Sequence, residues 1–234
     1  MTGVQTCALP IFNGPKAIRC DDAGNVWIVT QAGLGKITNG VVTNYVPGKE
    51  LGVPPPLQTL HENRDGGLWL GGWTGLFSLR NGAFSKVIPN INVHALHQDR
   101  QGDLWIGSHE GLVKYRDGAK QIWKTGDGLP HDIIRVIHES QHESRQGTLW
   151  IGTAGGLAQF RDGRFTVFTT KDGLVSDHVW SIHEDEDGVL WIGTADGGLS
   201  RFQDGRFTNY TTAEGLYDNG VFQILEDTRG YLDR

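Results

Sequence analysis

The stretch GTLWIGTAGGLAQFRDGRFTVFTTKDGL at residues 147–174 has a near copy in GVLWIGTADGGLSRFQDGRFTNYTTAEGL at residues 188–216. The same pattern returns, with more variation, in the first half of the chain. Each copy carries a tryptophan between aliphatic residues, and these tryptophans recur at intervals of about 40 residues, a typical length for a structural repeat. The five are Trp27, Trp69, Trp105, Trp150 and Trp191. The chain therefore consists of tandem repeats.

Each copy predicts four short antiparallel strands. The last two strands are joined by an Asn-Gly or Asp-Gly pair, the strongest short signal for a tight hairpin. Tight hairpins exclude a parallel β-solenoid, and the missing 3.6-residue period excludes helical repeats. Four-stranded antiparallel units in tandem predict an all-β protein with the β-propeller fold. The five turns are Asn39-Gly40, Asn81-Gly82, Asp117-Gly118, Asp162-Gly163 and Asp204-Gly205.

The repeat divides the chain into about five complete blades and the start of a sixth. Five and a fraction blades cannot close the ring of about six to eight that this blade length suggests. We therefore expect an open, truncated arc over residues 15–234. The blades are expected near residues 15–46, 56–88, 93–124, 133–169 and 179–211, with a partial blade at 221–234.

Residues 1–14 are expected to be a non-native or disordered leader outside the propeller. The first 11 residues, MTGVQTCALPI, resemble a translated sequencing adapter. They lack the apolar core and basic flank of a signal peptide.

The repeated tryptophans are predicted to be structural. A lone four-stranded sheet has two apolar faces and cannot bury either by itself, so it needs copies of itself on both sides. We expect the five tryptophans and their aliphatic neighbours to fill the gaps between adjacent blades as the core.

Composition excludes some classes of partner. The net charge of −6 argues against nucleic acid, which requires clustered Lys and Arg. The chain has no apolar run of the length that spans a bilayer, so we expect no membrane contact by this segment. Two cysteines are too few for a disulfide scaffold.

The consensus ED-x-x-G-x-LWIGT-x-x-GL-x-x-F-x-DG-x-F-x-x-YT-x-x-DGL resembles the two-component regulator propeller repeat, with five copies over residues 15–227. The resemblance implies the periplasmic or extracytoplasmic ligand-sensing region of a histidine kinase or hybrid two-component receptor. It implies a small-molecule or glycan ligand, a homodimer in the full-length receptor and a separate output domain. It implies no enzymatic activity and no cofactor for the propeller itself.

The positions that vary while their neighbours repeat are candidates for ligand binding. One residue into the first strand, successive copies read Lys16, Gln58, His94, Arg135, Trp180 and Phe222. First strands line the central channel of a propeller, and a loop residue such as Tyr217 would stand at its mouth. Aromatic and polar groups there suit a sugar-like or aromatic ligand through stacking and hydrogen bonds. Free drift of surface positions would give the same variation. The predicted ligand-binding residues are His94, Arg135, Trp180, Tyr217 and Phe222.

No catalytic or metal site is predicted. His61, His97, His138 and His183 recur at one slot of the repeat. Duplication of a strand-end residue explains this as well as a metal ring does, and metal ligands must converge within ~2 Å of one ion. Two alternative functions stay open. One is a streptogramin-lyase-like enzyme that would use His131 and His178 with Asp132 and Asp177, and the other is a propeller that only binds proteins.

Overall fold

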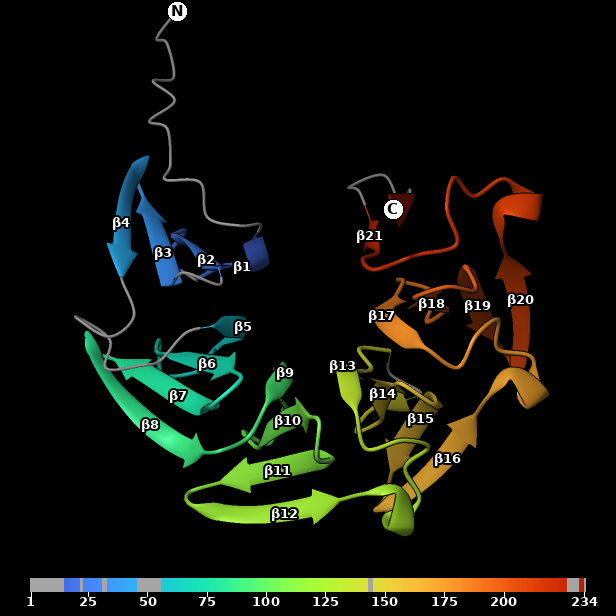
Figure 1. Ribbon diagram of the computed structural model, residues 1–234, viewed down its shortest axis with the longest axis horizontal. Coiled ribbons are helices and arrows are strands. Elements are labelled where there is room, and N and C mark those ends of the chain that lie inside the picture. Colours follow the sequence, from blue (N-terminus) through green and yellow to red (C-terminus); the bar gives the residue numbers. More distant parts are fainter. Residues whose placement is uncertain are drawn as a thin grey trace, which may run out of the picture. The chain divides into compact units, whose positions relative to one another are not determined.

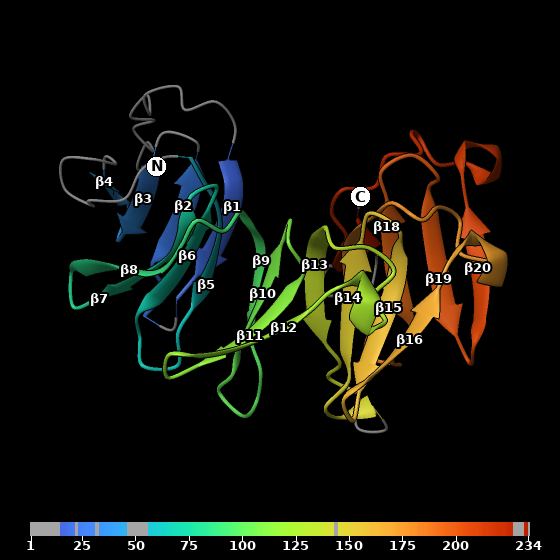
Figure 2. The ribbon, with the colours of Figure 1, turned by 60° about the horizontal axis from the view of Figure 1, so that its bottom comes forward.

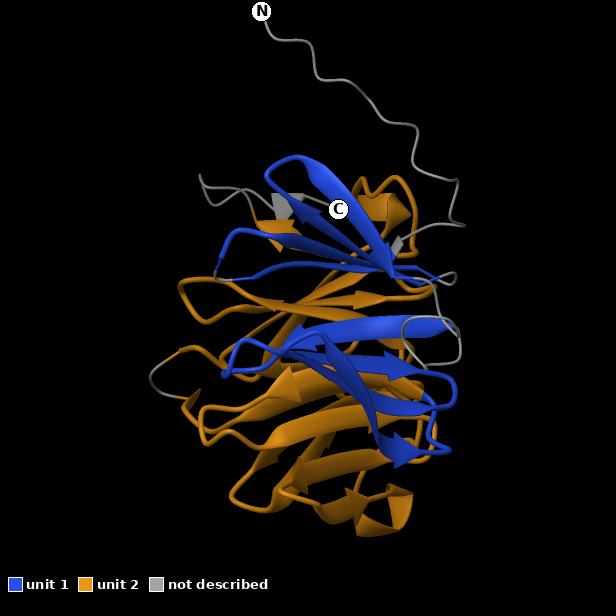
Figure 3. Cartoon of the chain, turned by 90° about the vertical axis from the view of Figure 1, so that its left-hand side faces the viewer, with its two compact units in different colours: residues 1–92 blue, residues 93–234 orange. Residues whose placement is uncertain are grey.

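The computed structural model describes residues 15–21, 23–30, 33–45, 56–142, 145–226 and 232–233. The expected leader, residues 1–14, lies outside the described residues. The chain divides into two compact units, residues 1–92 and 93–234, which Figure 3 shows in different colours.

The first unit contains two four-stranded antiparallel sheets, ordered as in the sequence (Figure 1). Their first strands, β1 and β5, contact each other. The first sheet consists of β1 (Pro15–Cys20), β2 (Val26–Thr30), β3 (Gly33–Thr38) and β4 (Val41–Tyr45). The second consists of β5 (Leu57–Glu62), β6 (Leu68–Gly72), β7 (Gly75–Arg80) and β8 (Ala83–Pro89).

The second unit repeats this arrangement three times and then begins another hairpin. In Figures 1 and 2 its sheets stand next to one another, and the first strand of each contacts that of the next. The sheets are β9 (Val93–Gln98) to β12 (Ala119–Trp123), β13 (Ile134–Glu139) to β16 (Arg164–Phe168) and β17 (Val179–Glu184) to β20 (Arg206–Tyr210). Their inner strands are β10 (Leu104–Ser108), β11 (Leu112–Arg116), β14 (Leu149–Thr153), β15 (Gly156–Arg161), β18 (Leu190–Thr194) and β19 (Leu199–Gln203).

A short antiparallel pair, β21 (Leu225–Glu226) and β22 (Leu232–Asp233), follows the last sheet. The fold is therefore all-β and built from propeller blades, as predicted. Single 3-10 turns connect blades in the second unit, at Thr125–Asp127, Thr170–Asp172 and Thr212–Glu214. Within the part of the chain that the structure describes, no helix has the length and apolarity needed to cross a membrane.

The tight turns have the backbone geometry that their sequences demand. Asn39, Asn81, Asp117, Asp162 and Asp204 all have φ between 49° and 51°. The glycine that follows each of them also has a positive φ, as a type I′ turn requires. These five turns confirm the predicted hairpins between the third and fourth strands.

Four of the five repeated tryptophans are buried, and Trp27, Trp105 and Trp150 pack against the blade that follows them. Trp105 and Trp150 are 3% and 1% exposed. Trp105 packs with Leu149 and Ile151 of the next blade, and its ring centroid lies 5.5 Å from that of Phe160. Trp191 is only half-buried. Trp27 in the first unit and Trp105 and Trp150 in the second therefore occupy the interface between neighbouring sheets.

In several copies, the indole of the tryptophan donates a hydrogen bond to the aspartate six residues before it. The indole Nε1 of Trp105 donates a hydrogen bond to Asp99 Oδ2 at 2.7 Å. The other carboxylate oxygen of Asp99 accepts from the backbone N–H of Asp103 at 2.8 Å. The same bond joins Trp27 to Asp21 at 2.9 Å and Trp191 to Asp185 at 3.0 Å. One carboxylate thus closes the turn between the first two strands and satisfies a buried indole.

The glycine of the WIG motif allows the next blade to approach closely. A Cβ on Gly152 would lie 2.5 Å from Val136 Cγ1 and 2.6 Å from Val179 Cγ1. A Cβ on Gly107 would lie 2.7 Å from Ile134 Cγ2. Val179 and Ile134 belong to the first strand of the following blade. At Gly107 and Gly152 a larger residue would therefore push neighbouring sheets apart.

We predict that Trp150→Ala lowers the free energy of unfolding by about 3–5 kcal/mol, because it removes a buried aromatic side chain and leaves a cavity. Trp191→Ala should cost less, since Trp191 is half-buried. Urea unfolding of both variants measures the difference. An equal loss for the two variants would contradict the assigned burial.

Gly152→Ala is predicted to destabilise the chain by about 1–3 kcal/mol through overpacking. Gly126→Ala is a matched control, because a Cβ on Gly126 meets no atom within 4 Å and open surface substitutions change stability by about 0.5 kcal/mol or less. Thermal melts of the two variants test the close approach. A Gly152→Ala variant as stable as its control would disprove it.

Candidate functional site

The variable residue near the start of each first strand is the extra residue of a β-bulge. In the ladder between β13 and β14, Ile134 pairs with Thr153 and Val136 with Gly152, so Arg135 has no partner residue. The same irregularity skips Lys16, Gln58, His94 and Trp180. A bulge redirects a side chain out of the regular alternation of a strand. The repeat therefore presents one non-ladder side chain per blade.

In the second unit these side chains form a row across neighbouring blades. The guanidinium carbon of Arg135 lies 4.8 Å from the centroid of the Trp180 ring. Trp180 meets Phe222 edge to face, with ring centroids 5.2 Å apart and an interplanar angle of 85°. The His94 ring stacks on His109 at 4.3 Å. We call this set of side chains the bulge row; it consists of His94, His109, Arg135, Trp180 and Phe222.

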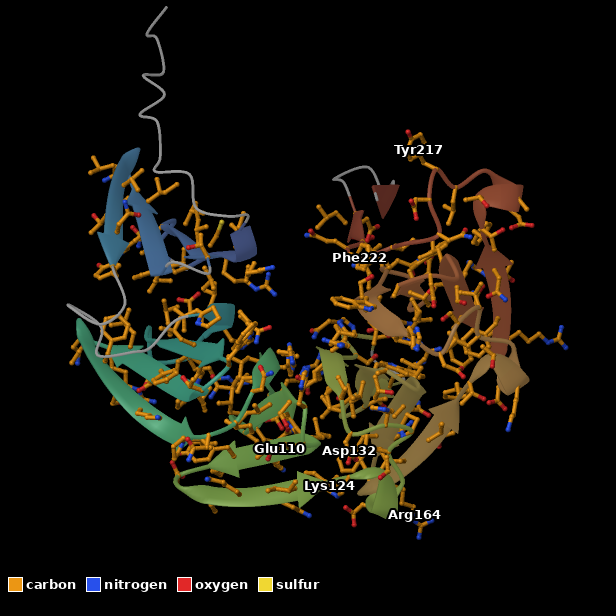
Figure 4. All side chains as sticks on the ribbon, viewed as in Figure 1. Glu110, Lys124, Asp132, Arg164, Tyr217 and Phe222 are labelled. Carbon is orange, nitrogen blue, oxygen red and sulfur yellow. The ribbon has the colours of Figure 1, made fainter. Side chains whose placement is uncertain are left out.

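The structure thus places four of the five predicted ligand-binding residues near one another. Tyr217 is the exception. Its side chain is fully exposed, and Figure 4 shows it on the loop before Phe222, pointing away from that residue. His109 was not predicted from the sequence. It stands in the turn between β10 and β11, and stacking on a ring from the same blade brings it into the row.

Burial and one positive charge keep the two histidines of the bulge row neutral. Burial, followed by the charges of His109 and Arg135, lowers the pKa of His94 to about 4. Burial and then Arg135 lower the pKa of His109. Burial also lowers the pKa of the Arg135 guanidinium, which stays charged at neutral pH because its ordinary value is so high. At pH 7 the row therefore carries one cation and no second charge of its own.

The repeated histidines outside the row have a structural partner. His97 Nε2 lies 3.2 Å from Glu139 Oε2, His138 Nε2 lies 3.4 Å from Glu184 Oε2, and His183 Nε2 lies 2.9 Å from Glu226 Oε2. In each pair the glutamate belongs to the following blade. The described residues contain no group of three His, Cys, Asp or Glu side chains placed to hold a metal ion. The sequence signal for these contacts was the recurring histidine slot, which is followed by a glutamate in His138-Glu139 and His183-Glu184.

Glu184 has several hydrogen-bond partners besides its histidine. Ser140 Oγ and the backbone N–H of Gln141 donate to it at 2.7 Å each. Burial raises the pKa of Glu184, but the hydrogen bonds from His138, Ser140 and Gln141 outweigh it and lower the pKa to about 2. A buried carboxylate with this many donors is held by the fold and needs no ligand to explain it.

The aspartates considered for lyase chemistry accept hydrogen bonds within the loops that connect the blades. Asp132 Oδ1 accepts from the backbone N–H of Thr125 at 2.8 Å, and Asp177 Oδ1 accepts from that of Thr170 at 2.7 Å. His178 Nδ1 lies 3.1 Å from Asp196 Oδ2, and the Ser176 hydroxyl donates to Asp196 at 2.6 Å. The histidine thus pairs with Asp196, and Asp177 holds the turn.

Comparison with known families identifies the repeat. The family Two component regulator propeller matches residues 87–110 and 173–196. These segments are two-component regulator propeller repeats. No curated protein matches the sequence.

Solved structures show the same fold at low sequence identity. The extracellular domain of BT3049 from B. thetaiotaomicron, assigned as a hybrid two component system, is similar with a TM-score of 0.81 and 22% identity over 93% of this chain. The present chain covers only 31% of the length of that domain. Virginiamycin B lyase from Staphylococcus aureus is similar with a TM-score of 0.65 and 18% identity, over 84% of this chain and 69% of the lyase. YCF48 bound to a D1 peptide has a TM-score of 0.65 and 13% identity, over 90% and 71% of the two chains.

We predict that the His94 imidazole titrates with a pKa of about 4 in the folded chain. Because this lies below the ordinary value of 6.5, the unfolded state binds more protons between the two values. The stability that depends on His94 should be complete above pH 6.5 and decline as the pH falls toward 4. A residue-specific NMR titration, assigned with His94→Gln, measures the midpoint. A midpoint near 6.5 would contradict the buried placement of the ring.

Proposed function

We propose that this chain is part of the ligand-sensing propeller of a two-component signalling receptor. In this proposal it lies in the periplasm or another extracytoplasmic compartment. It binds a small molecule or glycan and passes the signal to an output domain of the full-length protein. The propeller repeats and the likeness to an extracellular domain of a hybrid two component system support the proposal. A homodimer of the full-length receptor is part of the same proposal.

The observation that carries the proposal is the contact of Arg135, Trp180 and Phe222 across neighbouring blades. Each side chain comes from the one slot that the repeat does not keep constant. Trp180 is 38% exposed and Phe222 is 59% exposed, so both offer apolar surface next to a cation. Exposed aromatic rings beside a polar group are suited to sugar rings and to other flat ligands.

An enzymatic function has weaker support. The chain resembles a lyase in fold, but fold does not determine chemistry. The aspartates that an acid–base reaction would use, Asp132 and Asp177, already accept backbone hydrogen bonds from loops. We therefore propose a binding function without catalysis, cofactor or nucleic-acid partner.

We predict that Trp180→Ala in the full-length receptor raises the half-maximal ligand concentration at least tenfold, since losing one stacking contact costs about 1.4 kcal/mol or more. A transcriptional reporter, titrated with the oligosaccharide that elicits the largest wild-type response from a panel, gives the dose response. Thermal melting should change little, because the indole is partly exposed.

Ile122→Ala is the matched control, because Ile122 is also exposed but lies on the outer strand β12. It should leave both the dose response and the melt unchanged. An unaltered dose response in the double variant Trp180→Ala with Arg135→Ala would remove the bulge row from the proposed binding site.

A further inference from the structure

Arg135 is a half-buried cation without an acidic partner. None of the ion pairs between described residues includes it. Three other arginines of the second unit do have such partners, namely Arg116, Arg145 and Arg161. Arg116 pairs with Asp103, and Arg145 lies 3.5 Å from Glu184. In a chain whose net charge is −6, a half-buried cation without an ion pair is a candidate for binding an anion.

Among the described residues, the groups around Arg135 add no negative charge. Its neighbours in the bulge row are the Trp180 ring, the two rings of His94 and His109, and through Trp180 the ring of Phe222. The influences on the two histidines and on Arg135 itself are burial and positive charge. Burying a cation without compensation is unfavourable, and a bound anion would remove that penalty.

The geometry of the guanidinium favours one kind of anion. The Trp180 ring lies against it at 4.8 Å, while none of its N–H groups has a hydrogen-bond acceptor within the described ranges. A planar guanidinium stacked on an aromatic ring keeps its edge donors free, and that edge matches a carboxylate through two parallel hydrogen bonds.

A second polar atom in the row also lacks a partner. His94 Nε2 is buried and has no hydrogen-bond partner among the residues that the structure describes. A buried polar atom without a partner indicates a bound molecule or water that completes it. Because the His94 ring is neutral at pH 7, it can either donate or accept one hydrogen bond.

We propose that the bulge row binds an acidic sugar or a similar ring-bearing carboxylate. The carboxylate lies along the edge of Arg135, and the ring of the ligand packs in the corner between Trp180 and Phe222. This inference rests on the proposed sensing function and specifies its ligand class. It assigns recognition of charge to Arg135 and recognition of the ring to the two aromatic residues.

Glucuronate and glucose are suitable probes, because they differ only in a carboxylate that replaces a hydroxymethyl group. The full chain, labelled with ¹⁵N, is titrated with each sugar at pH 7 and low salt. The indole N–H signal of Trp180 is assigned by its loss in Trp180→Phe. Glucuronate should shift this signal with saturation, and glucose should need at least a tenfold higher concentration, equal to about 1.4 kcal/mol.

Three arginine variants complete the test. Arg135→Gln should abolish the preference for glucuronate, and Arg135→Lys should weaken it, because lysine keeps the charge without the planar fork. Arg201→Gln is the matched control, since the Arg201 guanidinium lies 5.8 Å from the Trp191 ring in the same blade as Trp180. It should keep the preference.

The outcomes separate this inference from the proposed function. Equal shifts by glucose and glucuronate, or a preference that survives in Arg135→Gln, would overturn the acidic-ligand inference and leave ligand sensing in place. No shift by either sugar would also overturn it, and the receptor dose response with Trp180→Ala would then decide the sensing function independently.

Discussion

A four-stranded sheet with two apolar faces is stable only when another sheet covers each face, and the rest of this structure depends on that constraint. Trp105 and Trp150 satisfy it by packing on the blade that follows. Gly152 satisfies it in the opposite way, by leaving the space that Val179 fills. The large indole and the absent side chain are therefore two parts of one interface. This explains why tryptophan and glycine occur together in the last four copies of the repeat, whereas the first copy has Val29 in place of the glycine.

The same interface determines where the repeat can vary. The first strand of each blade must pair with the second, yet the ladder skips one residue near its start. A residue left out of the ladder makes no backbone pair and faces no fixed neighbour, so its side chain can change without loss of the sheet. Histidine, arginine and tryptophan occupy this position in successive blades of the second unit. A structural irregularity thus supplies a row of positions that are free for binding.

Charge is distributed differently in the two kinds of histidine contact. Between blades, His97, His138 and His183 each meet a glutamate of the following blade, so each of these ring nitrogens has a carboxylate partner. In the bulge row the histidines lie near Arg135 instead, and burial followed by positive charge lowers their pKa values. The matched contacts are complete within the fold. The unmatched ones give the bulge row a single positive charge beside exposed aromatic surface, which is why we assign ligand binding there and a structural role to the others.

The strand order, the hairpin turns and most residues of the core could be predicted from the sequence. These features follow from local rules, such as the positive φ that Asp162-Gly163 accepts, and from repetition, which shows which residues every blade needs. The sequence also identified the variable slot that contains Arg135 and Trp180. Only the tertiary structure decided that this slot is a bulge, that Arg135 lies over Trp180, and that Tyr217 points away. It also decided that His97 meets Glu139, 42 residues later in the chain. Such contacts join residues from different blades, and their existence depends on how two sheets pack side by side, which no local pattern specifies.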